Sequence, residues 1–288
     1  ACTRIIFKMI IDGKKEAEII RNEIKKEISV LKTKNNKIPS LAVILIGDYV
    51  PSQIYVKNKE KNAKEVGINS QIVKYPKTVS EKEVLYKIEE LNKNINISGI
   101  LVQLPLPNQI SKEKIVNAIH PSKDVDGFHP VNVGNLSSGY ESIIPCTPLG
   151  CLLLIKKIEP NLSGKHAVII GRSNLNGKPM AQLLLKENCT VTIVHSKTNN
   201  LQSQCLKADI LVAAAGVPNL VKKDWIKKDV IVIDVGINKV GEKIIGDVNF
   251  DELKDKAKAI TPVPGGVGPM TIACLLKNTL KCFKAHLT

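Results

Sequence analysis

The sequence predicts an α/β protein of two domains, an N-terminal domain of βα repeats and a C-terminal Rossmann-type parallel sheet. Short apolar runs alternate with helical patterns along the chain, and the pattern changes character after Pro160. Aromatic residues make up only 3% of the 288 residues, whereas hydrophobic residues make up 43%. The core must therefore consist mainly of Ile, Leu, Val and Ala, a mixture typical of strands covered by helices.

In the first half, helical and strand patterns alternate and predict a parallel sheet. Residues 14–34 carry apolar side chains at helical spacing with charges on the other face, which indicates a surface helix. A helix from Ser52 to Val66 follows the turn at Gly47, and Ser52 has the side chain of an N-cap. The other expected elements are strands over 40–46, 71–75 and 99–104 and a helix over 80–91.

The second half contains runs that are typical of a nucleotide-binding sheet. A helix from Cys146 to Ile158 leads to Pro160, and we place the domain boundary in this region, near residue 150. Beyond it, short β-rich runs are separated by helical or loop segments. The expected strands cover residues 165–170, 190–194, 209–214 and 230–235.

The chain is basic, with a net charge of +15, which raises the question of nucleic-acid binding. Only Arg4, Arg21 and Arg172 among the 42 basic residues are arginines, and the lysines are scattered over helix faces. Lysine is the poorer residue for bidentate recognition of bases or phosphates. We therefore expect no nucleic-acid partner, and we expect the charge to attract acidic small molecules.

Cysteine usage and hydropathy indicate reduced thiols and no membrane segment, so we expect a cytoplasmic protein, with an organellar location as the alternative. The seven cysteines include no C-x-x-C pair, and we expect them to be reduced and mostly buried. The longest apolar runs, such as 100–106, are too short for a bilayer. The start of the chain has no clear cleavage site and no initiating Met, so a trimmed leader stays open.

A strand that ends at Ile170 runs into a glycine-containing loop and a helix, which is the context of a phosphate-binding turn. Gly171 and Gly177 permit close approach of the backbone, and Pro179 suits a first helical turn. The helix N-terminus offers free amides to an anion. Because the spacing is not G-x-G-x-x-G, an ordinary strand-to-helix turn is the alternative.

The end of the next strand favours NADP over NAD. An NAD site usually presents an acidic residue to the ribose at this point, but here the strand ends in Val-His-Ser-Lys. The side chains that can instead surround a 2′-phosphate are Arg172, Ser173, Ser196 and Lys197. Small residues around Gly216 and Ile237 leave room for a ribose and a nicotinamide.

One helix and one strand end carry the catalytic candidates. Ser52, Tyr55 and Lys59 are spaced by three and four residues, so they share one helix face. A solvated Tyr and Lys without a function is the alternative. Gln103 lies at the carboxyl end of its strand, where open parallel sheets bind ligands. It belongs to a structural network or orients a catalytic group.

Two loops complete the set of candidates. Residues 123–130 contain Asp124, Asp126 and His129, but the further oxygen ligands of a calcium loop are missing, so we expect no metal. Residues 261–271 contain three glycines and three prolines. A fixed loop with exposed amides suits the approach of a rigid planar ligand.

Seven motifs, in order along the chain, together resemble the methylenetetrahydrofolate dehydrogenase/cyclohydrolase family. They are YVKNK, GILVQLPLP, KDVDGFHP, PCTPLG, GRSNLNGKPM, HSKT and TPVPGGVGPMT. The resemblance implies a bifunctional, NADP-dependent homodimer that acts on tetrahydrofolate derivatives, whose polyglutamylated forms the basic surface would attract. It also implies a folate-binding catalytic domain over 1–150, an NADP-binding domain over 151–269, and a C-terminal helix over 270–288 that returns to the first domain.

The resemblance also implies roles for individual residues. Lys59 resembles the catalytic lysine, Gln103 the residue that positions it, and Tyr55 the ring stacked near the pterin. Asp126 resembles the carboxylate that anchors the pterin, and Asp124 is secondary. The other substrate-binding positions are Ser52, Pro264, Gly265, Gly266 and Val267, and the cofactor-binding positions are Gly171, Arg172, Ser173, Ser196, Gly216 and Ile237.

One departure from the family and three alternatives remain. Asn176 stands in the cofactor loop where relatives usually have an apolar residue, which puts NADP affinity in doubt. A dehydrogenase without cyclohydrolase activity is the main alternative, although the presence of Lys59, Gln103 and Tyr55 favours the bifunctional enzyme. The others are a basic binding protein and a hydroxy-acid oxidoreductase, which would require a His-Asp or Arg pair that we do not find.

Overall fold

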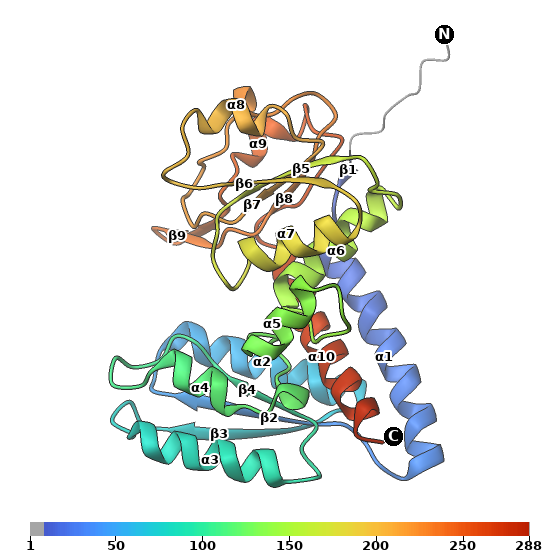
Figure 1. Ribbon diagram of the computed structural model, residues 1–288, viewed down its shortest axis with the longest axis vertical. Coiled ribbons are helices and arrows are strands. Elements are labelled where there is room, and N and C mark those ends of the chain that lie inside the picture. Colours follow the sequence, from blue (N-terminus) through green and yellow to red (C-terminus); the bar gives the residue numbers. More distant parts are fainter. Residues whose placement is uncertain (1–8, 288) are drawn as a thin grey trace. The chain divides into compact units, whose positions relative to one another are not determined.

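The structure is a computed structural model that describes residues 9–287, and the chain divides into two compact units. Unit 1 comprises the residues up to Ala17 and Thr147–Thr271, and unit 2 comprises Glu18–Cys146 and the residues from Ile272 onward. Helices α1 (Gly13–Asn35) and α10 (Val267–Ala285) contribute residues to both units (Figure 1). These units place residues 9–17 with the C-terminal sheet, whereas we expected them in the first domain.

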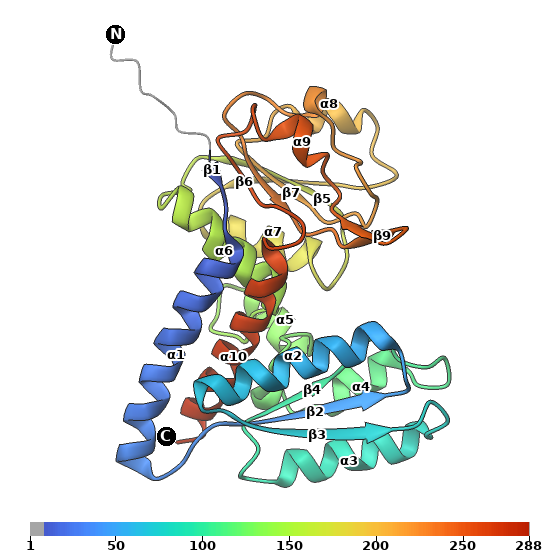
Figure 2. The same cartoon turned by 180° about the vertical axis from the view of Figure 1, so that it is seen from behind.

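The sheet of unit 2 is parallel, with the strand order β3-β2-β4. Its elements are β2 (Ser40–Ile46), α2 (Val50–Val66), β3 (Asn69–Tyr75), α3 (Glu81–Lys93), β4 (Gly99–Val102), α4 (Lys112–Ala118), a 3₁₀ turn η1 (Pro121–Lys123) and α5 (Pro130–Ser137). Helices α2 and α3 cover opposite faces (Figure 2). Ile44 of β2, Ile88 of α3 and Ile115 of α4 share one buried cluster. The expected βα repeats are confirmed, and α4, η1 and α5 are additions.

The start of α2 differs from the prediction. Its N-cap is Tyr49 and Pro51 lies in its first turn, so the assignment of Ser52 as N-cap is wrong. Proline favours the earlier start because its fixed φ suits a helix and it has no N–H to leave unpaired. The Ser52 hydroxyl instead donates to the Leu104 carbonyl at 3.4 Å, which ties α2 to the segment after β4.

The aspartate loop, residues 123–130, is anchored at its start by the buried side chain of Lys123. The Lys123 ammonium donates to the carbonyls of Leu91, Asn92 and Asn94 at 3.1, 2.7 and 2.8 Å. These carbonyls end α3, where helical partners are lacking. Lys123 therefore caps α3 and joins it to the loop that carries Asp124 and Asp126.

Helix α10 and strand β4 hold the middle of the aspartate loop. Asn278 of α10 donates from Nδ2 to the carbonyls of Val125 and Ile144 at 2.9 and 2.8 Å. A Cβ atom at Gly99 would lie 2.2 Å from Val125 Cγ1, so the close packing of the loop on β4 requires glycine there. The loop is thus fixed by contacts from distant parts of unit 2.

The sheet of unit 1 is also parallel, with the order β1-β11-β8-β7-β5-β6. Its strands are β1 (Met9–Ile10), β5 (His166–Ile170), β6 (Thr190–Val194), β7 (Ile210–Ala213), β8 (Ile231–Asp234) and β11 (Ala259–Ile260). Strands β5 to β8 are those that the sequence predicts, which confirms the Rossmann-type half. Strands β1 and β11, of two residues each, are too short to show an alternating pattern.

The remaining elements of unit 1 lie between these strands. They are α6 (Cys146–Ile158), α7 (Gly177–Lys186), α8 (Leu201–Cys205), the 3₁₀ turn η2 (Lys223–Trp225), the antiparallel hairpin of β9 (Asn238–Val240) and β10 (Lys243–Ile245), and α9 (Phe250–Leu253). Strand β5 pairs with β6 on one side and β7 on the other. Open parallel sheets bind ligands at such a switch point, outside the carboxyl ends of the strands.

The cysteines of the described chain are buried and are not joined in disulfides, as the sequence predicts. They are Cys146, Cys151, Cys189, Cys205, Cys274 and Cys282. Cys2, Arg4 and the segment in which we considered a leader lie outside the described residues. None of the helices within residues 9–287 combines the length and the apolar character that a bilayer span requires.

Replacement of Lys123 by Met should lower the free energy of unfolding of the chain by about 3 kcal/mol, because three carbonyls lose a charged donor. Urea denaturation measures this change. The matched control is Lys114→Met, since Lys114 forms a solvent-exposed ion pair with Glu81 and its replacement should change the stability far less. Equal stability of the two variants would contradict the capping role of Lys123.

Candidate active site

Lys59 and Gln103 form the centre of the candidate site in unit 2. Lys59 lies on the buried side of α2, and its Nζ donates to Gln103 Oε1 at 2.8 Å. Gln103 follows β4, and its Nε2 donates to the Leu104 carbonyl at 2.8 Å. Because the amide nitrogen is used in this way, the oxygen of Gln103 faces the lysine. The structure therefore brings together the two residues that the sequence singled out separately.

Burial changes the proton affinity of the lysine. Removal of Lys59 from water lowers its pKa, because the charged ammonium loses hydration, while the nearby Asp126 carboxylate and, to a smaller extent, the Cys146 thiol oppose this shift. An amine with a lowered pKa can be neutral at physiological pH. Such an amine can take a proton from water and later return it.

Asp126 is the carboxyl group whose charge acts on this lysine. Burial raises the pKa of Asp126 to about 6, the positive charge of Lys59 works against this shift, and Asp124 adds to it. In the described part of the chain, its carboxylate receives one hydrogen bond, a long one of 4.0 Å from the Cys146 thiol. Asp126 therefore keeps most of its acceptor capacity for a ligand.

Asp124 has a different environment from Asp126. It accepts hydrogen bonds from the backbone of Gly127 and His129 at 3.1 and 2.8 Å and from Asn132 Nδ2 at 3.0 Å. Its oxygens are used to shape the aspartate loop. Within residues 9–287, no group of three or more His, Cys, Asp or Glu side chains is arranged to hold a metal ion.

Tyr55 and Ser52 share the α2 face of Lys59. Tyr55 is 37% exposed, so part of this residue is accessible to a ligand. Partial burial also raises the pKa of the Tyr55 hydroxyl. Ser52 is buried, with its hydroxyl on the Leu104 carbonyl. Ser52 therefore lies beside the Gln103 segment, and its role as a substrate ligand stays a prediction.

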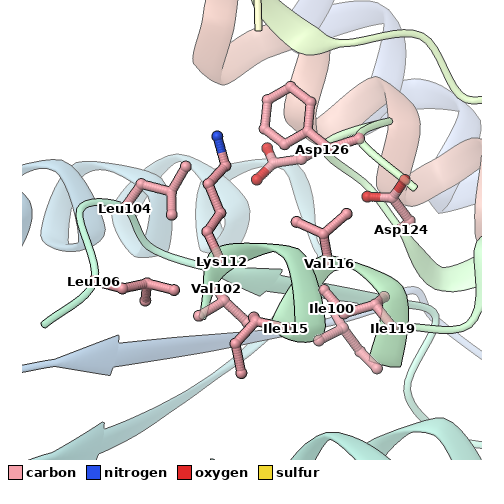
Figure 3. A pocket seen from close by; sticks show the side chains of 11 residues that line it. Ile100, Val102, Leu104, Leu106, Lys112, Ile115, Val116, Ile119, Asp124 and Asp126 are labelled. Atoms are coloured by element: carbon pink, nitrogen blue, oxygen red, sulfur yellow. The ribbon is translucent and has the colours of Figure 1, made fainter. Parts of the chain in front are cut away.

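A pocket below Asp126 contains groups that the sequence analysis missed. Side chains of β4 and α4, among them Ile100, Val102 and Ile115, line it, and Asp126 and Lys112 lie at one end (Figure 3). The Lys112 ammonium lies 5.9 Å from the centroid of the Phe128 ring, and its charge lowers the pKa of Asp126. No local pattern marks Lys112, because its place depends on how α4 packs.

Cys146 is a second missed neighbour of Asp126. Its thiol donates to the Val125 carbonyl at 3.4 Å and accepts from Asn278 Nδ2 at 3.5 Å. Burial raises the pKa of Cys146 well above its usual range, and the charge of Asp126 adds to this shift. The PCTPLG motif includes this cysteine, but the sequence analysis predicted no role for it and no contact with Asp126.

In unit 1, the loop after β5 has the close packing that a nucleotide site requires. A Cβ atom at Gly171, where φ is +119°, would lie 2.3 Å from the Ala214 carbonyl oxygen. One at Gly177 would lie 2.1 Å from the Gly171 carbonyl oxygen. Glycine is thus required for the strand, loop and helix α7 to approach each other. Asn176 caps α7 without a side-chain hydrogen bond, so the positive end of the helix can face an anion.

The residues expected at the 2′-phosphate come together at the ends of adjacent strands. Arg172 and Ser173 follow β5, Ser196 and Lys197 follow β6, and all four are exposed. The Gly171 backbone donates to the Val194 carbonyl at 2.8 Å, which keeps the two segments side by side. This cradle of glycine, amides and cationic side chains fits a phosphorylated dinucleotide.

The other expected cofactor and folate positions of unit 1 differ in exposure. Pro264 is exposed, Gly265 is half-buried, and Gly266 and Val267 are buried. Gly216 follows β7 and is exposed, and Ile237 follows β8 and is 55% exposed. Residues 264–267 lead into α10, with Gly265 at a φ of +107°. Pro264 and Pro105 both follow cis peptide bonds. The roles of these positions stay predictions.

Comparison with known protein families gives matches in both halves of the chain. Residues 11–126 match the family described as "Tetrahydrofolate dehydrogenase/cyclohydrolase, catalytic domain". Residues 145–287 match "Tetrahydrofolate dehydrogenase/cyclohydrolase, NAD(P)-binding domain". The first range contains Lys59, Gln103 and Asp126, and the second contains the cofactor loop.

Individual relatives agree with these matches. The bifunctional protein FolD of Pelagibacter ubique is 69% identical over 276 residues, which cover 96% of this chain and 98% of the relative. The crystal structure of the bifunctional enzyme FolD, methylenetetrahydrofolate dehydrogenase/cyclohydrolase, from Campylobacter jejuni has a TM-score of 0.94 at 49% identity and covers 96% of this chain and 99% of its own. The Trypanosoma brucei methylenetetrahydrofolate dehydrogenase-cyclohydrolase, complexed with NADP cofactor and inhibitor, has a TM-score of 0.92 at 38% identity, with coverages of 97% and 98%. The chain therefore belongs to the tetrahydrofolate dehydrogenase/cyclohydrolase family.

Proposed function

We propose that this chain is an NADP-dependent methylenetetrahydrofolate dehydrogenase that also has methenyltetrahydrofolate cyclohydrolase activity. It oxidises methylenetetrahydrofolate to methenyltetrahydrofolate and hydrolyses that product to 10-formyltetrahydrofolate. The observation that carries the proposal is the buried Lys59 amine, hydrogen-bonded to Gln103 at 2.8 Å and subject to the charge of Asp126, in a chain of this family. Hydride transfer by itself moves no proton, so an amine of lowered pKa favours the bifunctional enzyme over a dehydrogenase alone.

In the oxidation, the residues of unit 2 bind and orient the folate. Asp126 accepts hydrogen bonds from the N–H groups of the pterin, and the Tyr55 ring stacks on it. When bound at the loop after β5, NADP supplies the acceptor for the hydride that leaves the methylene carbon. The contribution of the chain is alignment, with the reacting atoms roughly 3–3.5 Å apart.

In the hydrolysis, Lys59 moves protons. The neutral amine removes a proton from the water that adds to the methenyl carbon, and the resulting ammonium gives a proton to the nitrogen that departs when the ring opens. Gln103 Oε1 accepts one N–H of the amine and so directs the lone pair. The positive charge of the methenyl substrate would lower the pKa of Lys59 further.

The proposal extends to partners and location. The loop at 264–267 would contact the folate, and Gly171, Gly216 and Ile237 would contact the cofactor. The net charge of +15 supports attraction of polyglutamylated folates. We also propose a cytoplasmic homodimer, which gel filtration and light scattering would test.

The deciding experiment uses the purified chain with methylenetetrahydrofolate and either NADP or NAD. We expect faster reduction of NADP, followed in the same sample by loss of the methenyl absorbance in the absence of further cofactor. Lack of NADP reduction would refute the dehydrogenase assignment. A methenyl product that decays only at the uncatalysed rate would refute the cyclohydrolase assignment.

Replacement of Lys59 by Met should reduce cyclohydrolase turnover by at least about 100-fold, because the proton-transferring group is lost. Lys59→Arg should be equally inactive, since a guanidinium does not release its proton. In the unmodified chain, turnover should rise with pH as Lys59 deprotonates, and it should level off below the pKa of an ordinary lysine. Lys57→Met, on the exposed side of α2, is the matched control. Full turnover of Lys59→Met would exclude Lys59 from catalysis.

Replacement of Asp126 by Asn should weaken folate binding by about 10- to 100-fold and leave NADP binding unchanged, because one charged acceptor of the pterin is lost. The pKa of Asp126 is about 6, so the carboxylate is lost as the pH falls through 6. The KM of the unmodified chain for folate should therefore rise below pH 6, whereas that of the Asn variant should not. Titration calorimetry and pH-dependent kinetics test both effects. Asp251→Asn, an exposed carboxylate of unit 1, is the control.

Replacement of Arg172 by Ala should raise the KM for NADP by about 10- to 100-fold and change the KM for NAD little, because NAD lacks the 2′-phosphate. Lys228→Ala, at another exposed cation of unit 1, should affect neither. An equal rise in KM for NADP and for NAD would show that Arg172 does not contact the 2′-phosphate.

A further inference from the structure

Two buried aspartates at the carboxyl ends of β7 and β8 were not among the predicted site residues. Asp234 is the last residue of β8 and is 3% exposed, and Asp247 follows the β9–β10 hairpin and is 0% exposed. Burial of two carboxylates is costly unless hydrogen bonds replace the lost water. Their partners therefore show what this part of the fold stabilises.

Asp234 closes the base of the β9–β10 hairpin. Its Oδ1 accepts from the backbone of Gly236 and of Asp247, and its Oδ2 accepts from Val248, all at 2.9 Å. Gly236 leads into the hairpin and Asp247 follows it. A Cβ atom at Gly246 would lie 1.8 Å from Asp234 Oδ2, so the return strand packs directly on this carboxylate.

Asp247 extends the contact to the neighbouring strand. Its Oδ2 accepts from the backbone of Ala215 and Gly216 at 2.6 and 2.9 Å, and its Oδ1 accepts from Asn238 Nδ2 at 2.8 Å. One carboxylate thus joins the turn after β7 to the segment after β8. These segments contain Gly216 and Ile237, the proposed cofactor contacts.

The turn after β7 is held at its ends by backbone hydrogen bonds, from Ala214 to the Ile170 carbonyl at 2.8 Å and from Asn219 to the Gly246 carbonyl at 3.2 Å, and Asp247 holds its middle. Residues 215–217 are exposed, and Gly216 has a φ of +68°. Ala215 and Gly216 offer almost no side-chain surface for packing, so the hydrogen bonds from their backbone to Asp247 fix the position of these two residues. A turn held by a buried anion keeps its outward face free for a ligand.

We infer that Asp247 is a positioning residue for the cofactor, which sets the turn after β7 and the segment after β8 at the spacing that NADP requires. The inference rests on the proposed function. Asp247 does not contact the nucleotide in this scheme and acts through the backbone of Ala215 and Gly216. Its substitution should therefore affect cofactor binding selectively.

The test compares Asp247→Asn with Asp209→Asn in the full chain. Asp209 is a matched control because it also accepts a backbone hydrogen bond, from His166 at 2.8 Å, but at the amino ends of the strands. Asp247→Asn replaces one carboxylate oxygen by an NH2 group, which cannot accept a hydrogen bond from the backbone of Ala215 and Gly216 or from Asn238. The turn after β7 should then shift, and the NADP dissociation constant measured by calorimetry should rise at least about tenfold. The same factor should appear in the KM for NADP. Asp209→Asn should keep its NADP affinity.

Cyclohydrolase turnover is the control for folding, because a general loss of structure would lower this turnover as well as NADP affinity. It needs no cofactor, and its proposed residues lie in unit 2. We expect Asp247→Asn to retain this activity and the KM for folate within about twofold of the unmodified chain. If Asp247→Asn does not fold, Asn238→Ala, which removes one partner of Asp247, should still raise the NADP dissociation constant by about threefold.

Three outcomes would overturn the inference. They are unchanged NADP affinity in Asp247→Asn, unchanged affinity in Asn238→Ala when the first variant does not fold, and an equal loss in Asp209→Asn. Failure of the proposed function is distinguishable, because then the unmodified chain itself would neither bind NADP nor reduce it.

Discussion

Burial of the Lys59 amine is the constraint around which unit 2 is built. An ammonium removed from water loses a large hydration free energy, and a single amide oxygen, that of Gln103, replaces only part of it. The lysine responds with a lowered pKa, which is the property that proton transfer requires. Asp126 limits how far the pKa of Lys59 falls, because its negative charge favours the ammonium form. The capped end of α3 and Asn278 of α10 keep that carboxyl group near the amine.

In both units, a carboxylate that accepts backbone hydrogen bonds fixes the shape of a loop, and other groups of that loop stay available to the ligand. In the aspartate loop, Asp124 accepts backbone hydrogen bonds, and Asp126, two residues later, keeps its acceptors open. In unit 1, burial raises the pKa of Asp234 to about 6, and three backbone N–H groups oppose that shift. Asp234 and Asp247 fix loops whose outward faces carry the proposed cofactor contacts. Backbone donors make such buried carboxylates tolerable without a neighbouring cation.

The sequence predicts what depends on short-range pattern and misses what depends on packing. Lys59 and Gln103 could be found because helical spacing and a strand end mark their positions, and their contact follows from the βα repeat. Ser52 as N-cap was wrong because Pro51 allows the helix to begin earlier. Contacts between distant segments left no local signal. Lys112 reaches Asp126 only through the packing of α4, and Asp247 meets Ala215 across 32 residues.

The buried cysteines have a consequence for the chemical durability of the molecule. The thiolate is the form that peroxides and electrophiles attack. Burial raises the pKa of Cys205, Cys274 and Cys282 to about 12, and it raises the pKa of Cys146 well above the ordinary thiol range. At neutral pH these sulfurs are almost entirely protonated and shielded by the core. A thiol beside the proposed reaction centre can therefore persist under oxidative stress without a reductant to regenerate it.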